Sequence, residues 1–366
     1  MILVVMMHVD EMHYSHFFAQ TPFAGPWDIL TSVAKPARMP TFFAISGFLA
    51  SRAVWRPWSE IFRKRVLLLY YLYALWLAIS LGIFRLLYAK WDSHFLPSLF
   101  KGIANQLIFP QTLLWFLYAL VIFFIFARTL RALPWIITFS FAILLSAFSE
   151  TFTWPTSSYL ARSLLFFLIG AYIPTTLSCI AERASPRMAL WSGASFLALT
   201  GLILVAGKMT PGIWLPASVA GVWFCLTISK LLASTRAGWP LIQIGQKTLP
   251  IFVLHGTFLT LLNYVCDRWA SPIMRVLSHN ILISAIYPVA INILVLSGTL
   301  AAHRLLLSLG QRWLFSLPTW TAPKQPVSRG NGKPPAPADP VRVEPIGSGY
   351  SLDCRNLGPT SDSTCR

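Results

Sequence analysis

Residues 38–65 read RMPTFFAISGFLASRAVWRPWSEIFRKR and decide the class of this protein. The run Met39–Ser51 holds no charged residue, whereas the fourteen residues after it hold five basic side chains and one acid, Glu60. Lys and Arg are enriched in the cytoplasmic loops that border transmembrane helices. An apolar run that ends in a basic cluster therefore predicts a membrane helix that meets the cytoplasm near Ser51.

The composition of the whole chain points to the same class. Its 366 residues have a mean hydropathy of +0.63, and 56% of them are hydrophobic while only 11% are charged. Soluble domains hold about 25% charged residues, so we expect this chain to lie in a lipid bilayer. The net charge of +17 comes from short basic clusters between apolar runs rather than from a continuous stripe, and we therefore expect no nucleic-acid partner.

The apolar runs predict an all-α polytopic integral membrane protein with about ten transmembrane helices. A span needs about 20 residues, and the shorter runs reach this length through flanking Trp, Tyr and Pro residues. The runs are too long for strands and do not alternate. The predicted spans are Met1–Val9, Met39–Ser51, Val66–Tyr88, Leu113–Ala127, Trp135–Phe148, Tyr159–Pro174, Ala189–Ala206, Ile213–Leu232, Leu249–Cys266 and Ile281–Ala302.

The basic residues predict the orientation and the domain organisation. Alternate connections between the spans hold fourteen Lys and Arg residues against two acids, Glu60 and Glu182, and we assign these connections to the cytoplasm. Both termini then face the cytoplasm of a cell whose inner membrane holds the chain. From residue 316 the sequence is rich in Pro, Gly and Ser, so we expect a helical membrane domain over 1–315 and a disordered cytoplasmic tail over 316–366.

A histidine in the first apolar run is the leading catalytic candidate. Residues 1–17 read MILVVMMHVDEMHYSHF and place His8 near the outer end of this run, three residues before Glu11. Residues three apart share a helical face, and a carboxylate beside an imidazole fixes its tautomer, as a general base requires. The alternative is an interfacial cluster solvated by lipid headgroups. The spacing of His8, His13 and His16 does not place all three on one face, so we predict no metal site.

Two further intramembrane side chains are substrate-binding candidates, because polar groups at membrane depth are costly. His255 lies inside the ninth predicted span, in IGQKTLPIFVLHGTF, and the alternative is a hydrogen bond to a neighbouring helix. Arg162 lies in SYLARSLLFFLIGAY, either within the membrane or with its side chain extended to the outer interface.

Two candidates belong to the interfaces. Arg63 and Arg65 flank Lys64 in a run that either sets topology against anionic lipid or binds the phosphates of a soluble donor. Trp115, in TLLWFLYAL, is otherwise expected as an interfacial belt residue.

Several stretches together resemble the membrane acyltransferase 3 family. MPTFFAISGFLASR is similar to its Met-Pro-x-Phe-Phe-x-x-Ser-Gly-Phe-Leu signature. Five other stretches over residues 2–303 stand in the order that the family has: ILVVMMHVD before the signature, and FRKRVLLLYYLYALW, TLLWFLYAL, ARSLLFFLIGAYIP and IGQKTLPIFVLHGTF after it. The resemblance implies an integral-membrane O-acyltransferase. Such an enzyme moves an acyl group, often acetyl, from a cytoplasmic donor such as acetyl-CoA to a hydroxyl of a glycan or another cell-envelope or small-molecule acceptor. No bound cofactor is implied beyond the acyl-CoA substrate.

The resemblance also implies roles for single residues. His8 matches the catalytic histidine, as base or transient acyl carrier, and the signature falls on Ser46 and Gly47. The basic step falls on Arg63 and Arg65, which the resemblance places against the CoA phosphates; Trp115 and His255 match two further positions.

The chain departs from the family pattern at one position. The family carries a basic residue about eleven positions before the histidine, which here falls before Met1, so we expect the first span to be truncated or to start upstream. A catalytically impaired homologue is one alternative to an active enzyme, and a proton-coupled transporter is another, since intramembrane His and Arg suit proton coupling.

Overall fold

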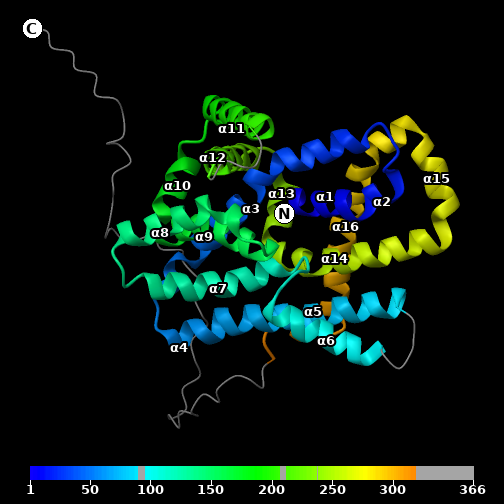
Figure 1. Ribbon diagram of the computed structural model, residues 1–366, viewed down its shortest axis with the longest axis horizontal. Coiled ribbons are helices and arrows are strands. Elements are labelled where there is room, and N and C mark those ends of the chain that lie inside the picture. Colours follow the sequence, from blue (N-terminus) through cyan, green and yellow to red (C-terminus); the bar gives the residue numbers. More distant parts are fainter. Residues whose placement is uncertain (90–94, 207–211, 237, 319–366) are drawn as a thin grey trace, which may run out of the picture. The chain divides into compact units, whose positions relative to one another are not determined.

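The computed structural model describes residues 1–89, 95–206, 212–236 and 238–318. Helices form the regular structure of these residues, and no strand occurs among them, which confirms the all-α prediction. Residues Met1–Leu317 pack as one compact unit (Figure 1). The predicted tail lies almost wholly outside the described residues, and the domain boundary stays a prediction.

The helices follow each other along the chain with short connections. The α-helices are α1 Ile2–Val9, α2 Ser15–Phe18, α3 Ala24–Val54, α4 Trp58–Ile61, α5 Leu68–Tyr88, α6 Phe95–Ile108, α7 Trp115–Leu130, α8 Trp135–Ala147, α9 Pro155–Tyr172, α10 Pro174–Glu182, α11 Pro186–Ala206, α12 Trp214–Ala233, α13 Gly238–Gln246, α14 Thr248–Val265, α15 Ser271–His279 and α16 Ile281–Ser308. Short π-helical turns are η1 Asp10–Tyr14, η2 Phe62–Leu67 and η4 Cys266–Ala270, and 3₁₀ turns are η3 Ser149–Thr151 and η5 Arg312–Leu314.

Several helices are long and apolar enough to cross a membrane. Five qualify by themselves within the described ranges: Trp58–Tyr88, Pro186–Val205, Trp214–Ala233, Thr248–His279 and Ile281–Ser308. The pair α9–α10 qualifies as one span bent by 81°, while α7 and α8 are apolar but shorter. The protein is thus a multi-pass membrane protein. Each predicted run falls largely within a helix, and the number of spans stays a prediction.

Two helices extend beyond the apolar runs that predicted them. Helix α3 begins at Ala24 rather than Met39, because Asp28, Lys35 and Arg38 interrupt the hydropathy without interrupting the helix. The first run likewise continues through η1 and α2 to Phe18. The apolar run alone suggested that His8 lies near the outer end of its helix. The helical stretch instead continues to Phe18, which places His8 well inside it.

Helices α3 and α9 make the closest helix contact in the site region. A Cβ added at Gly47 would lie 2.0 Å from the carbonyl oxygen of Phe167, and one added at Gly170 would lie 2.0 Å from that of Ala44. Helices in membranes associate through such small residues because lipid offers no hydrophobic drive for their association. Gly47, on which the family signature falls, thus supplies the close approach of α3 to α9.

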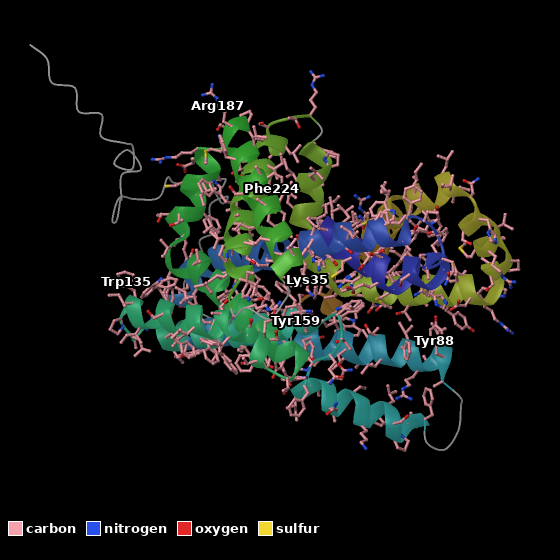
Figure 2. The ribbon with its side chains drawn as sticks, turned by 45° about the horizontal axis from the view of Figure 1, so that its top comes forward. Lys35, Tyr88, Trp135, Tyr159, Arg187 and Phe224 are labelled. Carbon is pink, nitrogen blue, oxygen red and sulfur yellow. The ribbon has the colours of Figure 1, made fainter. Side chains whose placement is uncertain are left out.

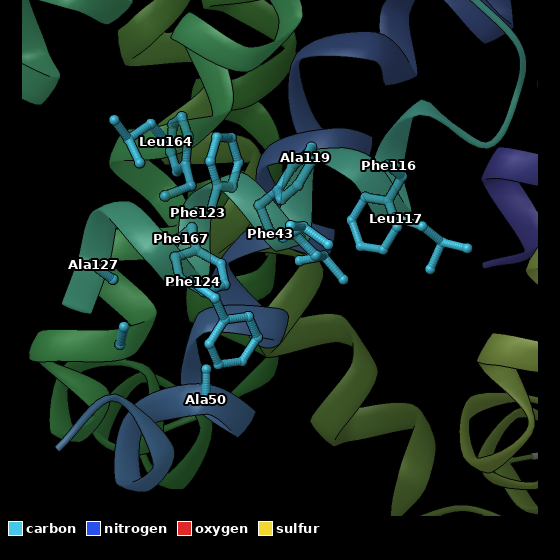
Figure 3. Close-up of a cluster of buried hydrophobic side chains, with 14 of the residues drawn as sticks. Phe43, Ala50, Phe116, Leu117, Ala119, Phe123, Phe124, Ala127, Leu164 and Phe167 are labelled. Atoms are coloured by element: carbon cyan, nitrogen blue, oxygen red, sulfur yellow. The ribbon is translucent and has the colours of Figure 1, made fainter. Parts of the chain in front are cut away.

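Aromatic rings fill the space beside this contact. Phe43 of α3 packs on Phe116 and Phe123 of α7 with ring centroids 4.7 and 5.0 Å apart, and Phe123 in turn packs on Phe167 of α9 (Figure 3). Interlocked rings at these distances lose contact energy if any helix shifts. The cluster therefore fixes α3, the helix that carries the predicted signature.

A second, smaller cluster holds the first helix. Val5 and Val9 of α1 are buried against Ile251 and Leu259 of α14 and against α16, which contributes residues such as Val295. His8 lies one residue before Val9 and three after Val5, so the same helical face carries its ring inward. This packing turns His8 toward α14, where His255 is located.

Candidate active site

Two histidine rings face each other inside the bundle. His8 on α1 exposes 7% of its surface and His255 on α14 exposes none. Their ring centroids lie 5.3 Å apart with an interplanar angle of 30°. The packing of α1 on α14 therefore brings together two predicted site residues that are 247 positions apart in the chain.

The hydrogen bonds of His255 define its tautomer. Its Nδ1 lies 2.6 Å from the carbonyl oxygen of Phe252 and 3.2 Å from that of Ile251. A carbonyl oxygen only accepts, so Nδ1 carries the proton and Nε2 holds a lone pair. That Nε2 has no hydrogen-bond partner among the described residues. His255 thus offers a buried basic nitrogen beside His8.

Glu11 lies beside His8 as predicted from their spacing. Its Oε2 is 3.8 Å from Nδ1 of His8, a distance at which a carboxylate attracts the ring proton without a short hydrogen bond. The Glu11 side chain itself is largely exposed. Nδ1 of His8 forms no hydrogen bond among the described residues, so Glu11 acts on the ring through its charge.

Arg38 is a member of the site that the sequence analysis missed. It lies on α3 with 7% of its surface exposed, and its Nη2 contacts the Sδ of Met7, next to His8 in the chain. Its Nε and Nη1 are buried and bond to nothing in the described part of the chain. Its charge acts on both His8 and Glu11.

The sequence around Arg38 predicts a residue at the membrane surface, whereas the structure buries it. Arg38 immediately precedes the apolar run Met39–Ser51, where an arginine normally marks a loop at the membrane surface. The helix continues backward to Ala24, however, and carries Arg38 into the packed interior. Whether Arg38 lies at the membrane surface or in the packed interior therefore depends on where α3 begins.

The polar residues that follow His8 anchor the first helical stretch to its neighbours. Asp10 accepts a 2.9 Å hydrogen bond from Oγ1 of Thr31 on α3. His13 is fully buried, with Nδ1 on Oδ1 of Asn263 and Nε2 2.8 Å from the hydroxyl of Tyr287. Among the described residues, no group of three or more His, Cys, Asp or Glu could hold a metal ion.

Trp115 is half-buried and packs on aromatic rings of α3 and α9. Its ring stacks on Tyr159 of α9 at 5.4 Å and lies 5.8 Å from Phe43. The ammonium of Lys35 lies 5.9 Å from the centre of the Tyr159 ring (Figure 2). Tyr159 also acts electrostatically on Arg38, so Trp115 joins the edge of the site through Tyr159.

Two predicted substrate-binding residues are engaged elsewhere. Arg162 forms an ion pair with Glu150, donates to Oγ of Ser149 at 3.1 Å and lies over the ring of Trp214 at 5.3 Å. Ser46 donates to the carbonyl of Phe42 in its own helix. The structure therefore does not bring either side chain to the His8–His255 pair.

A basic cavity lies at the other end of α3. It has a volume of about 260 Å³ and is lined by Arg52, Arg56 and Arg65, together with Glu60 and apolar neighbours. Arg56 pairs with Glu60 at 3.5 Å, which leaves two arginines to set its charge. The predicted pair is thus divided, because Arg65 lines the cavity and Arg63 is not among its lining residues.

Comparison with known proteins gives one family and one relative. The sequence model of a family described as an acyltransferase domain, the acyltransferase 3 family, matches residues 1–303. The chain is 27% identical over 291 residues to the inner membrane protein YcfT of Escherichia coli strain K12, covering 69% of this chain and 75% of that protein. No solved structure matches the chain.

Proposed function

Because the chain belongs to the membrane acyltransferase 3 family, we propose that it moves an acetyl group from cytoplasmic acetyl-CoA to a hydroxyl of a glycan or another envelope acceptor. The buried pair of His8 and His255 carries this proposal. It offers two imidazole nitrogens with lone pairs in the interior of a membrane bundle, where acyl transfer to an alcohol needs a base. Membership of this family favours acyl transfer over transport.

His8 acts as the base in the proposed reaction. Glu11 holds the ring proton on Nδ1, and Nε2 takes the proton of the acceptor hydroxyl as its oxygen attacks the thioester carbonyl carbon. The carbon–sulfur bond then breaks, and the thiolate leaves with the proton from Nε2. The products are an acyl ester and free CoA, and general-base help of this kind accelerates transfer about 10²–10⁴-fold.

The basic cavity is the proposed site for the phosphates of the donor. Arginine binds phosphate in a bidentate manner, and Arg52 and Arg65 line this cavity. Fourteen residues of α3 separate Arg52 from Arg38, which is about 21 Å of helix. A pantetheine arm of about 14 bonds spans roughly 16 Å when extended, and long arginine side chains bridge the remainder. In the proposed arrangement, one donor molecule reaches from the cavity to His8.

Arg52→Gln and Arg65→Gln are each expected to raise the KM for acetyl-CoA about tenfold while kcat stays the same. Each loses one charge-assisted contact to phosphate at an open cavity, where solvent reduces its strength. Steady-state kinetics of the purified protein in lipid nanodiscs measure both constants. Arg236→Gln, an exposed base outside the cavity, is the control. An unchanged KM in both cavity variants would place the donor elsewhere.

Acyl transfer itself is tested with labelled acetyl-CoA. We expect membranes that contain the full chain to move the label into an ester-linked envelope product, and membranes without it to move none. Proton-driven uptake of a small molecule without any labelled ester would support a transporter. Absence of both would support a catalytically impaired homologue. The cytoplasmic placement of both termini, tested with terminal reporters, stays a prediction.

A further inference from the structure

Three side chains of the bundle hold four buried polar atoms without partners among the described residues. They are Nε and Nη1 of Arg38, Nδ1 of His8 and Nε2 of His255, and none has a hydrogen-bond partner in the described ranges. Buried polar groups are nearly always paired, and a group that is not paired needs an explanation. The His8 ring lies 5.3 Å from that of His255, and Arg38 contacts Met7, the neighbour of His8 in the chain. Glu11 acts on Nδ1 of His8, so the free atoms of Arg38 and His255 are the ones that indicate a polar ligand.

Arg38 differs from the half-buried Arg162 of α9. Arg162 spends its donors on Glu150 and Ser149 and has a tryptophan face beside it. Arg38 forms no ion pair with any carboxylate of the described chain, although the charge of Glu11 acts on it from a greater distance. A buried guanidinium with two unused donors is suited to an oxygen that carries negative charge.

We propose that Arg38 is a catalytic residue that binds the carbonyl oxygen of the acyl donor and stabilises the oxyanion formed during transfer. This inference rests on the proposed function. It adds a second group to the reaction, because His8 handles the proton and Arg38 handles the charge. Arg38 stands next to His8 through Met7, so both reach the same carbonyl group.

The electron movements balance with Arg38 in this role. As the acceptor oxygen forms its bond to the carbonyl carbon, the electron pair of the C=O bond moves onto the carbonyl oxygen. The donors on Nε and Nη1 hold this oxyanion. The pair returns as the C=O bond re-forms, and the carbon–sulfur bond breaks to release the thiolate, which takes the proton held by His8. Arg38 neither gains nor loses a proton.

The test compares two donors that differ in one atom. Acetyl-CoA presents a carbonyl oxygen, whereas its dithioester analogue presents sulfur, a weak hydrogen-bond acceptor. We expect Arg38→Gln to lower kcat with acetyl-CoA about 10²–10³-fold, the usual loss for one oxyanion donor, with little change in KM. The ratio of the oxygen rate to the sulfur rate is expected to fall by a similar factor, since the analogue gains little from Arg38.

Arg38→Lys and Arg187→Gln complete the design. Lysine keeps the charge without the planar fork, so we expect a smaller loss and an intermediate ratio. If Arg38→Gln does not fold, the ratio in Arg38→Lys decides. Arg187 is exposed at the start of α11 (Figure 2), and its variant is expected to match the wild type.

The outcomes separate the two proposals. A variant whose rates with both donors fall equally shows that Arg38 only supports the structure, and this overturns the inference while leaving acyl transfer intact. Wild-type protein without any transfer overturns the proposed function itself. A lowered ratio in Arg38→Gln supports the role of Arg38 in holding the oxyanion.

Discussion

Replacing His8 by alanine is expected to lower the kcat for acyl transfer about 10²–10⁴-fold, the usual contribution of a general base. His8 is buried, its ring lies 5.3 Å from that of His255, and a carboxylate oxygen of Glu11 lies 3.8 Å from its Nδ1. The backbone carbonyl of Phe252 fixes the ring of His255 in its own place, so we expect its Nε2 not to substitute for that of His8. The rate is measured with labelled acetyl-CoA and the purified full chain.

His16→Ala is the matched control for this variant. His16 belongs to the same N-terminal helical stretch but is exposed and pairs with Asp267 at 2.9 Å, so we expect nearly wild-type transfer. Thermal unfolding of both variants shows whether lost activity reflects lost structure. Transfer within twofold of the wild type after His8→Ala would remove His8 from the mechanism.

Gly47→Ala is expected to destabilise the protein by about 3 kcal/mol, at the upper end of the cost of overpacking. The new Cβ would lie 2.0 Å from the carbonyl oxygen of Phe167 and 3.0 Å from the amide nitrogen of Ala171. These atoms belong to the backbone of α9, so no side chain can move aside. The two helices must separate, and the aromatic cluster around Phe43 loses contact with them. Thermal unfolding in detergent micelles measures the effect.

Variants of two other glycines serve as comparisons for Gly47→Ala. Gly170→Ala should cost a similar amount, because its Cβ would meet the carbonyl oxygen of Ala44 from the other side. Gly82→Ala in α5 meets nothing within 4 Å and should stabilise the protein by about 0.5–1 kcal/mol, since alanine favours a helix. Equal stability of Gly47→Ala and the wild type would show that α3 and α9 do not pack this closely.

The sequence predicts the fold class well because composition and apolar runs report on the environment of the whole chain. It also brings forward His8, His255 and Gly47, each of which stands out as an unusual residue within an apolar helix. The sequence does not reveal residues such as Arg38, because the apolar run begins only at Met39 whereas the helix already begins at Ala24. Helix propensity and hydropathy are separate quantities, and only the packed structure shows where they diverge.

Partner choice is the other limit. Nothing in the sequence around Arg162 shows that Glu150, twelve residues earlier, takes its charge. Likewise, Arg63 and Arg65 are equivalent in the sequence, but they lie in the π-helical turn η2, and only Arg65 lines the cavity. The direction of a side chain depends on the turn that carries it, which periodic patterns assume to be regular.

The π-helical turn η1 determines which residues of the first helical stretch share a side. In a regular α-helix each residue advances about 100°, so His8 and His13, five positions apart, would point about 140° away from each other. The wider turn over Asp10–Tyr14 takes up one residue, and the fifth position behaves as the fourth. Both rings are consequently buried, His8 beside His255 and His13 on Asn263. The additional residue in the π-helical turn thus places His13, which anchors the helix, and His8, which carries the proposed chemistry, toward the same side.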